Sequence, residues 1–326
     1  MKAIRVRAPG GPEALQLDDV SVPAPGAGEA LVRIESIGVN FIDVYHRTGL
    51  YPLETPFTPG REAAGVVESI GEDVTEFQPG DRVAWVLSPS YAELAIVPAA
   101  KLVPVPDDVS FDNAAALMLQ GLTAHYLSHS TFPIQDGQRV LVHAAAGGVG
   151  LLLVQMAKKR GARVFGTVST DAKAEAAKRA GVDVVIRYTE DDFEEVIRKE
   201  TDDEGLHAVY DSVGQTTFDK SLKCLRPRGL LVLFGQSSGP VPPFELARLG
   251  GGGSLFVTRP TLAHYMLDRN ELLDRSKDIL GWVERGELTV TIDRKLPLAE
   301  AGEAHRLLEG RKTSGKLLLT PSQDNF

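Results

Sequence analysis

A glycine-rich stretch, HAAAGGVG at residues 143–150, stands between an apolar segment and a stretch with helical patterning. Aligned to the pattern G-x-G-x-x-G, it places Ala145, Gly147 and Gly150 at the three template positions, so only the first glycine is replaced. In that pattern the glycines allow a tight turn and a close approach of the backbone to a pyrophosphate at a helix amino terminus. The methyl group of Ala145 is compatible with such a turn where φ is negative. The stretch therefore predicts a dinucleotide site, with contacts from Ala145, Ala146, Gly147, Gly148, Val149 and Gly150.

The residues after the next strand indicate which dinucleotide is bound. An acidic residue about 20 positions beyond the glycines usually binds the ribose 2′-hydroxyl of NAD. Here the residue nineteen positions after Gly150 (169 − 150) is Ser169, and Lys173 follows it closely. Serine adds no negative charge, and a lysine can offer a cation to a 2′-phosphate. The sequence therefore favours NADPH, while the nearby Asp171 keeps NAD open.

The segments around this turn alternate between apolar strands and helices. The expected strands are RVLVHA, ARVFGTVS, VDVVIRY, HAVYDSV and GLLVLFG, and two of the expected helices end at Gly161 and Gly181. Such alternation predicts an α/β fold with a doubly wound parallel sheet and helices on both of its faces. The run GGGGS at 250–254 is expected to be a flexible loop, followed by a strand in SLFVTRP and by helical sequence from about 261 to 285.

The two ends of the chain have a different sequence pattern. Residues 1–117 contain short apolar or β-branched segments separated by Gly, Pro and Asp, which is typical of a β-rich module. The tail returns to short strands around one helix. We therefore expect a β-rich domain formed by residues 1–117 and 259–326, with an α/β domain at 118–258 inserted into it.

Composition excludes several classes of protein. The chain has 326 residues and a net charge of −9, without a long basic tract, which argues against nucleic acid as a primary partner. It has no apolar run of about 20 residues to cross a membrane and no signal-peptide pattern, so we expect a cytoplasmic protein. The single cysteine, Cys224, can form neither an internal disulfide nor a structural zinc site, and we expect it to be a buried, inert thiol.

Several motifs together resemble one known family. The matching segments run nearly from end to end of the chain: GGPEAL, IGVNFIDVYHRTGLYP, PGREAAGVV, GDRVAW, YAEL, LQGLTAHYL, VLVHAAAGGVG, AVYDSVG, LLVLFGQSSG and GKLLL. They resemble the zinc-free NADPH:quinone oxidoreductases of the medium-chain dehydrogenase/reductase superfamily, the group that includes zeta-crystallin. The resemblance implies a Rossmann-type sheet inserted in a GroES-like barrel domain, with NADPH as the cofactor and a quinone as the substrate.

Three positions depart from the zinc alcohol dehydrogenases of the same superfamily. Where those enzymes place Cys, His and Cys around zinc, this sequence has Asn40, Arg61 and Gln120. Two amides and a guanidinium do not replace the thiolates and imidazole that give such a site its affinity. His125 and His129 lack a neighbouring cysteine or carboxylate, so we expect them on a helix surface. No metal ion is expected.

Without a metal to polarise a carbonyl, the favoured substrates are those that accept hydride readily. Reduction of a quinone gives an aromatic hydroquinone, so we expect quinone reduction, either by hydride or by single electrons. The catalytic task is then mainly to position the nicotinamide against the acceptor and to hydrogen-bond the developing oxyanion. Two alternatives stay open: an enone or 2-alkenal reductase, and a non-catalytic NADPH-binding protein with a crystallin-like or RNA-binding role.

The resemblance also implies roles for individual residues. Asn40 stands at the vacated metal position and can donate an amide hydrogen to the cofactor or the substrate. Tyr45 and Tyr51 can hydrogen-bond a quinone oxygen or relay a proton, and Asp43 can orient this network. Further contacts to NADPH are expected at the helix that links the domains, at strand ends and in GKLLL. They are Gln120, Thr123, Tyr188, Ser212, Phe234, Gly235, Ser237, Val257, Arg259 and Lys316, besides Ser169 and Lys173.

The segment SLFVTRP is expected to be the edge strand of the nucleotide-binding sheet. An exposed apolar edge favours pairing with another chain. Together with the resemblance, this predicts a homodimer formed through the nucleotide-binding domain.

Overall fold

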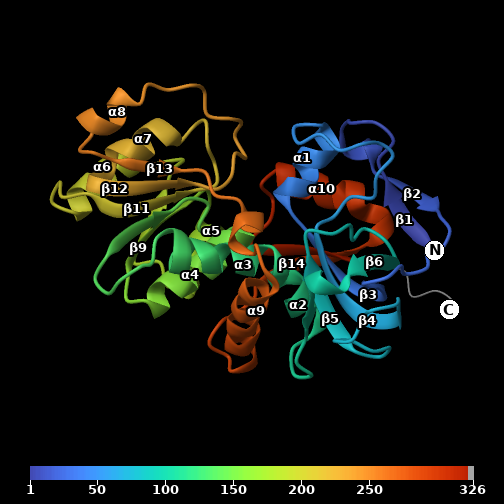
Figure 1. The fold of residues 1–326 in the computed structure, drawn as a ribbon. Coiled ribbons are helices and arrows are strands. Elements are labelled where there is room, and N and C mark those ends of the chain that lie inside the picture. Colours follow the sequence, from blue (N-terminus) through green and yellow to red (C-terminus); the bar gives the residue numbers. More distant parts are fainter. Residues whose placement is uncertain (322–326) are drawn as a thin grey trace. The chain divides into compact units, whose positions relative to one another are not determined.

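The computed structural model describes residues 1–321 and contains two compact units (Figure 1). Unit 1 is formed by Met1–Leu122 and by the chain from Met266 onward, and unit 2 by Thr123–Tyr265. The boundaries lie at 122/123 and 265/266, rather than at 117/118 and 258/259 as expected from the sequence.

Two local features explain these boundaries. Helix α3 (Gln120–Tyr126) runs without a break through the first of them. The ring of Tyr265 stacks on that of Tyr126 with 4.2 Å between the centroids, and the Thr131 hydroxyl donates a hydrogen bond of 2.9 Å to the Tyr265 oxygen. These contacts hold the short 3₁₀ helix η4 (Leu262–Tyr265) in unit 2.

Unit 2 contains the expected doubly wound sheet. Its six strands lie in the order β10-β9-β8-β11-β12-β13, and all neighbours are parallel. In this order the chain reverses its direction of travel between β8 and β11, and open α/β sheets bind ligands beyond the carboxyl ends of the strands at such a point. The strands are β8 (Arg139–Val142), β9 (Arg163–Val168), β10 (Val184–Arg187), β11 (Leu206–Asp211), β12 (Leu225–Leu233) and β13 (Phe256–Thr258).

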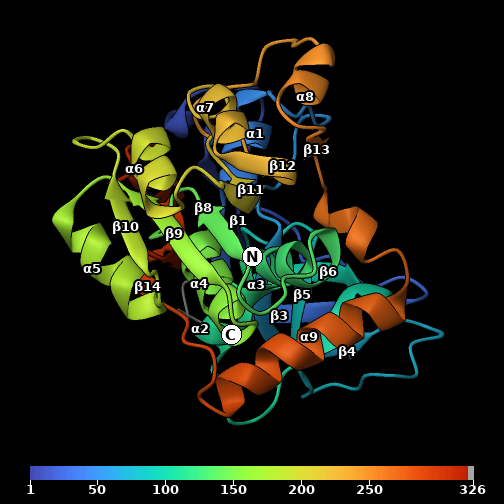
Figure 2. The same cartoon turned by 90° about the vertical axis from the view of Figure 1, so that its left-hand side faces the viewer.

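Helices cover both faces of this sheet (Figures 1 and 2). One face is covered by α4 (Gly148–Lys159) and α5 (Asp171–Ala180), and the other by α6 (Phe193–Glu200) and α7 (Phe218–Lys223). Gly181 closes α5 with φ 108°, a left-handed conformation that glycine adopts without strain. Cys224 ends α7 and is buried, and its burial raises the pKa of the thiol to about 12, as expected of an inert cysteine.

Two segments of unit 2 differ from their sequence-based expectations. Gly250 and Gly251 are not in a flexible loop but in the short helix α8 (Ala247–Gly251). His125 is not on a helix surface: it is 5% exposed, and its ring stacks on that of His129 at 4.4 Å. The second histidine follows α3 in a π-helical turn (Leu127–Thr131), which brings the two rings together.

Unit 1 is built on a sheet whose neighbouring strands are antiparallel, except for one parallel pair at its edge. Its strands lie in the order β14-β15-β3-β4-β5-β7, and β6 also pairs with β3. The hairpin of β1 (Lys2–Arg5) and β2 (Gln16–Asp19) forms a separate small sheet. The larger sheet consists of β3 (Glu29–Val39), β4 (Glu62–Ile70), β5 (Arg82–Val86), β6 (Leu94–Pro98), β7 (Leu102–Pro104), β14 (Ile292–Pro297) and β15 (Lys316–Thr320).

The alternation of side chains between the two faces of a strand explains how the longest strand, β3, packs on the core. Ala30, Val32 and Ile34 share one face, since alternate strand residues point the same way. The pairing of β3 with β4 shifts register between Ile34 and Ser36, and beyond this irregularity Ile37 and Val39 take over the core positions. The bulge therefore keeps both halves of a long strand buried.

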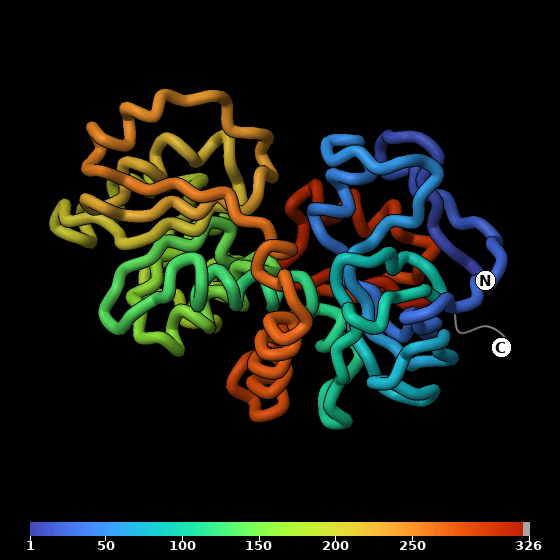
Figure 3. Tube along the Cα trace, in the orientation of Figure 1, coloured from blue at the N-terminus to red at the C-terminus, as the bar shows by residue number. Residues whose placement is uncertain are grey.

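Four longer helices complete unit 1: α1 (Phe41–Thr48), α2 (Phe111–Met118), α9 (Arg269–Glu284) and α10 (Ala301–Glu309). Strand β15, from the end of the chain, pairs with β3 from its beginning, so the blue and red segments meet within this unit (Figure 3). Over residues 1–321, none of the helices combines the length and the apolar composition needed to cross a membrane.

Candidate active site

The glycine-rich turn joins β8 to α4 at the carboxyl end of the central strands. Gly147 is the residue that precedes the helix, and its backbone is extended, with φ −77° and ψ 171°. The left-handed residue of the turn is Ala144, with φ 51°, whereas Ala145 is not among the residues with positive φ. A methyl group at the first template position is therefore accommodated because the strained backbone lies one residue earlier.

Gly150 packs closely against the same turn. A Cβ atom at this position would lie 2.4 Å from the carbonyl oxygen of Ala144. The third glycine of the pattern thus allows α4 to approach the strand end, as the template requires.

The first residue of the motif, a buried histidine, is held in place by side-chain hydrogen bonds. His143 is 2% exposed, and its ring nitrogens lie 3.0 Å from the Thr167 hydroxyl and 2.9 Å from the Ser221 hydroxyl. Ser221 donates in turn to the buried carboxylate of Asp211 at 3.3 Å. Burial lowers the pKa of His143 and so favours its neutral form, while the charge of Asp211 opposes this shift. The sequence motif included His143 but did not indicate this structural role.

The residues expected near the adenosine lie together at the carboxyl ends of β9 and β10. Ser169 follows β9, and Tyr188 follows β10, with its N–H 3.2 Å from the Val168 carbonyl oxygen. Lys173 lies in the first turn of α5, and its N–H donates to the hydroxyl of Thr170, which precedes the helix.

Asp171, the residue that left NAD open, is ion-paired with Arg187. Arg187 also pairs with Glu190, so three charged side chains are linked here. Arg187 is not predictable from the sequence as part of this group, because an arginine at a strand end carries no pattern that distinguishes it from a solvated one.

The residues expected near the nicotinamide gather at the carboxyl ends of β11, β12 and β13. The N–H of Phe234 donates to the Asp211 carbonyl oxygen at 2.9 Å, and that of Ser237 to the Ser212 carbonyl oxygen at 3.2 Å. At Gly235 a Cβ atom would lie 2.6 Å from the Ser212 carbonyl oxygen, so the two strand ends touch. Arg259 follows β13, after Val257, and its guanidinium donates to the Leu233 carbonyl oxygen at 3.0 Å.

In unit 1, Asn40 is the centre of a buried polar cluster. It is 3% exposed, and its amide nitrogen donates to a carboxylate oxygen of Glu62 at 2.6 Å. Its amide oxygen accepts hydrogen bonds from the Lys316 ammonium at 2.8 Å and from Gln120 at 3.1 Å. Since an ammonium only donates, the lysine fixes which end of the Asn40 amide is the oxygen.

Lys316 and Glu62 form a buried ion pair within this cluster. Their side chains are 2% and 0% exposed. Burial lowers the pKa of Lys316, and the Glu62 carboxylate opposes that shift. Lys316 is thus not a solvated lysine, and its contacts within unit 1 are to Glu62 and Asn40. Glu62 directly follows Arg61 but was not predicted as a site residue, because its partners Asn40 and Lys316 lie 22 and 254 residues away in the chain.

Asp43 caps the amino terminus of α1, the helix that begins after Asn40. Its carboxylate accepts the Asn40 backbone N–H at 2.8 Å and the Tyr91 hydroxyl at 3.1 Å. The Tyr91 oxygen lies 3.1 Å from Nε2 of His305, and Arg47 donates to Nδ1 of that ring at 3.2 Å. Asp43 therefore orients the start of α1, and a directional chain of buried groups holds it in place.

Burial dominates the titration of this chain of groups. It raises the pKa of Asp43 to about 7 and lowers the pKa of His305 to about 3. The charge of Arg47 adds to the effect on His305. At neutral pH His305 is uncharged, and with Nδ1 accepting from Arg47 its Nε2 carries the proton and donates to the Tyr91 oxygen.

Tyr45 and Tyr51 lie edge to face, with 5.2 Å between their ring centroids, and both are half-buried. The backbone N–H of Tyr51 donates to the Tyr45 carbonyl oxygen at 3.0 Å. The ring of His46 lies edge to face with that of Tyr51, with 6.1 Å between the centroids, and its Nδ1 donates to the Tyr51 carbonyl oxygen at 3.0 Å. The structure thus brings both phenols together at one end of α1.

Thr123 lies in α3, three residues after Gln120, and is 7% exposed. The boundary between the two units falls directly before it, so Gln120 belongs to unit 1 and Thr123 to unit 2.

The chain is similar to known proteins along most of its length. The chain matches the family models "Zinc-binding dehydrogenase" over residues 148–271 and "Alcohol dehydrogenase GroES-like domain" over residues 26–107. It is 45% identical to a 2-haloacrylate reductase of Burkholderia sp., covering 96% of both chains, and 44% identical to a quinone oxidoreductase of Pseudomonas aeruginosa, covering 98% of this chain and 99% of the relative. The chain belongs to the quinone oxidoreductase family of the medium-chain dehydrogenase/reductase superfamily.

A solved structure extends the likeness to three dimensions. A mycobacterial protein, solved as a complex with NADPH, is 47% identical to this chain and has a TM-score of 0.96. The superposition covers 98% of this chain and all of that one. The Rossmann-type sheet and the GroES-like domain expected from the sequence are therefore confirmed.

The family model that matches residues 148–271 is described as a zinc-binding dehydrogenase, and the resemblance stated above implies Asn40, Arg61 and Gln120 at the three zinc-ligand positions. Two amides and a guanidinium do not fit a zinc ion. Asn40 and Gln120 are hydrogen-bonded to each other, and Lys316 places a positive charge beside them. Among residues 1–321, no group of three or more His, Cys, Asp or Glu side chains is arranged to hold a metal.

Proposed function

We infer that this chain is an NADPH-dependent quinone oxidoreductase. The observation that carries this conclusion is 44% identity to a quinone oxidoreductase over nearly the full length of both chains. The fold it shares with a relative solved in complex with NADPH supports the cofactor. The glycine-rich turn and the absence of an acidic residue at Ser169 point to the same dinucleotide.

For the cofactor, we propose that residues 145–150 hold the pyrophosphate at the start of α4. Ser169, Lys173 and Tyr188 would surround the 2′-phosphate, and Ser212, Phe234, Gly235, Ser237, Val257 and Arg259 the nicotinamide end. Gln120, Thr123 and Lys316 complete the expected set, Lys316 through its contact with Asn40. Bound NADPH supplies the hydride.

We propose that the reaction needs no metal ion. Asn40 has one amide hydrogen bonded to Glu62, and its second has no hydrogen-bond partner in the described part of the chain. That hydrogen can donate to a substrate or cofactor oxygen, while Lys316 and Gln120 keep the amide in place. Tyr51 or Tyr45 would hydrogen-bond the acceptor oxygen, and Asp43 would act on both through the start of α1.

A second function is favoured by one comparison. The 45% identical relative named 2-haloacrylate reductase reduces, by its name, an activated carbon–carbon double bond. Reduction of an enone or 2-alkenal by this chain uses the same hydride donor and the same oxyanion contacts.

The test is NADPH consumption with 1,4-benzoquinone, 9,10-phenanthrenequinone and 2-hexenal, repeated with NADH. A higher kcat/KM for quinones with a preference for NADPH supports the main proposal. A higher kcat/KM for 2-hexenal supports the second function. If NADPH binds but no acceptor oxidises it, the main proposal fails and the non-catalytic role is favoured.

We further propose a homodimer that forms through β13. This strand ends the sheet of unit 2, and its Phe256 is 59% exposed. A cytoplasmic location and the lack of a nucleic-acid partner are also proposals, which rest on the composition alone. Sedimentation of wild type and of Phe256→Lys, which should dissociate the dimer, tests the first of these.

A further inference from the structure

Arg61 directly precedes β4 and has an unusual environment. Within residues 1–321 its guanidinium makes no ion pair and no hydrogen bond, although its Nε is buried. Two other arginines of unit 1 do form ion pairs, Arg47 with Glu309 and Arg269 with Glu76. A buried donor without a partner costs free energy, so its retention points to a ligand that supplies the missing acceptor.

A cavity of about 250 Å³ lies at this arginine. Its polar wall includes Arg61, His46 and Thr58, and its apolar wall includes Leu53, Phe57 and Pro89. The apolar side suits the body of a small organic acceptor, and the arginine suits a charged group on it.

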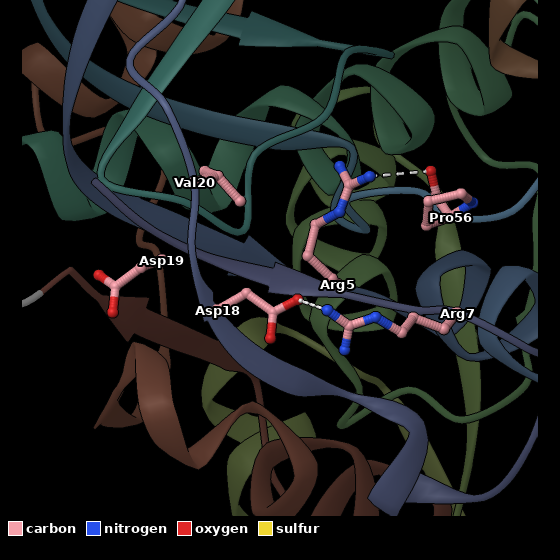
Figure 4. A pocket seen from close by; sticks show the side chains of 6 residues that line it. All are labelled: Arg5, Arg7, Asp18, Asp19, Val20 and Pro56. Carbon is pink, nitrogen blue, oxygen red and sulfur yellow. Dashed lines mark hydrogen bonds and ion pairs between the residues drawn. The ribbon is translucent and has the colours of Figure 1, made fainter.

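A larger cavity, of about 460 Å³, provides a contrast (Figure 4). It is lined by the β1–β2 hairpin, and its cations already have partners: Arg7 donates to Asp18 at 2.7 Å, and Arg5 donates to the Pro56 carbonyl oxygen at 3.0 Å (Figure 4). Nothing at that cavity calls for an external anion.

A second cation lies near Arg61 and is also without a carboxylate. The Lys101 ammonium donates only to neutral groups, the Leu87 carbonyl oxygen at 3.1 Å and the Ser88 hydroxyl at 3.4 Å. Burial lowers the pKa of Lys101, and the charge of Arg61 lowers it further. Burial and the charge of Arg61 also lower the pKa of His46, whereas its hydrogen bond to the Tyr51 carbonyl oxygen raises it. An anion in the cavity would relieve this repulsion.

Two carboxyl groups are close enough to be considered as partners of Arg61. Asp43 interacts with it only through space, forms no ion pair with it, and has its pKa raised to about 7 by burial. Glu54 lies on the cavity rim and is exposed to solvent. Neither carboxyl group forms an ion pair with Arg61, so its guanidinium has no direct carboxylate partner within the described part of unit 1.

We propose that this cavity binds acceptors that carry an anionic group, a carboxylate or a sulfonate, and that Arg61 is the residue that selects them. The reduction itself rests on the proposed function. With an α,β-unsaturated carboxylate, the hydride of NADPH adds to the β-carbon and a proton from solvent to the α-carbon, which gives the saturated carboxylate and NADP⁺. With an acid-substituted quinone, hydride and a proton give the hydroquinone. In both cases the anionic group is unchanged and stays bound to the guanidinium.

A matched pair of acceptors tests this selection. The kcat/KM of wild type and of Arg61→Met is measured with 1,2-naphthoquinone-4-sulfonate and with 1,2-naphthoquinone. A charge-assisted hydrogen bond predicts a loss of about tenfold to a hundredfold for the sulfonate in the variant, and a change of less than about threefold for the neutral quinone. Arg61→Lys, which keeps the charge, should recover part of the loss. Arg306→Met, an exposed arginine on α10, controls for net charge and should change neither value.

Equal losses for both quinones in Arg61→Met would overturn the proposal. A binding measurement separates it from the proposed function. Isothermal titration of wild type and Arg61→Met with naphthalene-2-sulfonate, which cannot be reduced, should show binding to wild type that the variant loses. Equal binding, or none to wild type, contradicts the anion site even if quinones are reduced. Selective binding without reduction of any acceptor supports the site and refutes the proposed function.

Discussion

The ammonium of Lys316 lies 2.8 Å from the amide oxygen of Asn40, although 276 residues separate them in the chain. Asn40 is the residue that we propose to contact the cofactor or the substrate, and Lys316 places a positive charge beside it. The charge is fixed in place by Glu62, which bonds both residues. This arrangement keeps a polar, preorganised site without a metal ligand set.

Replacement of Lys316 by methionine should destabilise the fold. Glu62 would then be a buried carboxylate without a cation, and breaking a buried pair in this way costs about 3 to 5 kcal/mol. Urea unfolding measures the loss. The double variant Lys316→Met/Glu62→Gln should regain most of the stability, yet keep a lowered kcat/KM because Asn40 is no longer held. Full activity of the double variant would show that the cluster is only structural.

The free energy of unfolding should depend on pH through Asp43. Its pKa rises from 3.8 to about 7 on folding, so between about pH 4 and pH 7 the folded state keeps a proton that the unfolded chain has released. Stability from this group is therefore present at low pH and is lost as the pH rises. The pKa of His305 falls from 6.5 to about 3 on folding, so its contribution to stability increases as the pH rises. The pH dependence of wild-type stability therefore reports only the difference between the two contributions.

Comparison of Asp43→Asn with wild type isolates that contribution. From about pH 5 to pH 7 the variant should gain about 2 to 3 kcal/mol relative to wild type. Parallel stability curves for the two proteins would mean that Asp43 is already charged at pH 5.

Lys173→Ala should weaken NADPH selectively. Loss of a charged donor to the 2′-phosphate is expected to raise the KM for NADPH about tenfold or more and to leave the KM for NADH within about twofold. Lys178→Ala, on the exposed side of the same helix, is the matched control. An equal rise for both cofactors would refute the role given to Lys173.

Gly150→Ala should damage the glycine-rich turn. The added Cβ would meet the Ala144 carbonyl oxygen at 2.4 Å, so α4 or the turn must move. We expect a loss of about 1 to 3 kcal/mol in stability and weaker NADPH binding, measured by thermal unfolding with and without the cofactor. Gly250→Ala, where no atom lies within 4 Å of the new Cβ, should be nearly neutral. A Gly150→Ala protein that binds NADPH normally would show that close approach at this position is unnecessary.

The strands and helices of unit 2 follow from the sequence because their signals are local. RVLVHA and HAVYDSV are apolar runs bounded by turn residues, and both became buried parallel strands. The unit boundaries were less predictable, since the stacking of Tyr265 on Tyr126 joins residues far apart in the chain. Gly250 and Gly251 show the limit of composition, because a glycine run can still form a helical turn.

The polar cluster of unit 1 shows what local patterns miss. Asn40 could be chosen from its motif, but Glu62 could not, because its importance comes from the approach of Lys316 across 254 residues. The resemblance selected Lys316 as a cofactor contact, but nothing in GKLLL predicts that its side chain is buried and paired with Glu62. Likewise the missing partner of Arg61 is a property of the cavity rather than of the sequence.

The most direct test of the account is the rate of NADPH oxidation by 1,4-benzoquinone in a preparation whose zinc content is known, before and after treatment with EDTA. Metal-free hydride transfer predicts the same kcat/KM in both samples, at a zinc content far below one ion per chain. Loss of activity with EDTA and its return on addition of zinc would contradict the account, and the cluster around Asn40 and Lys316 would then need a different explanation.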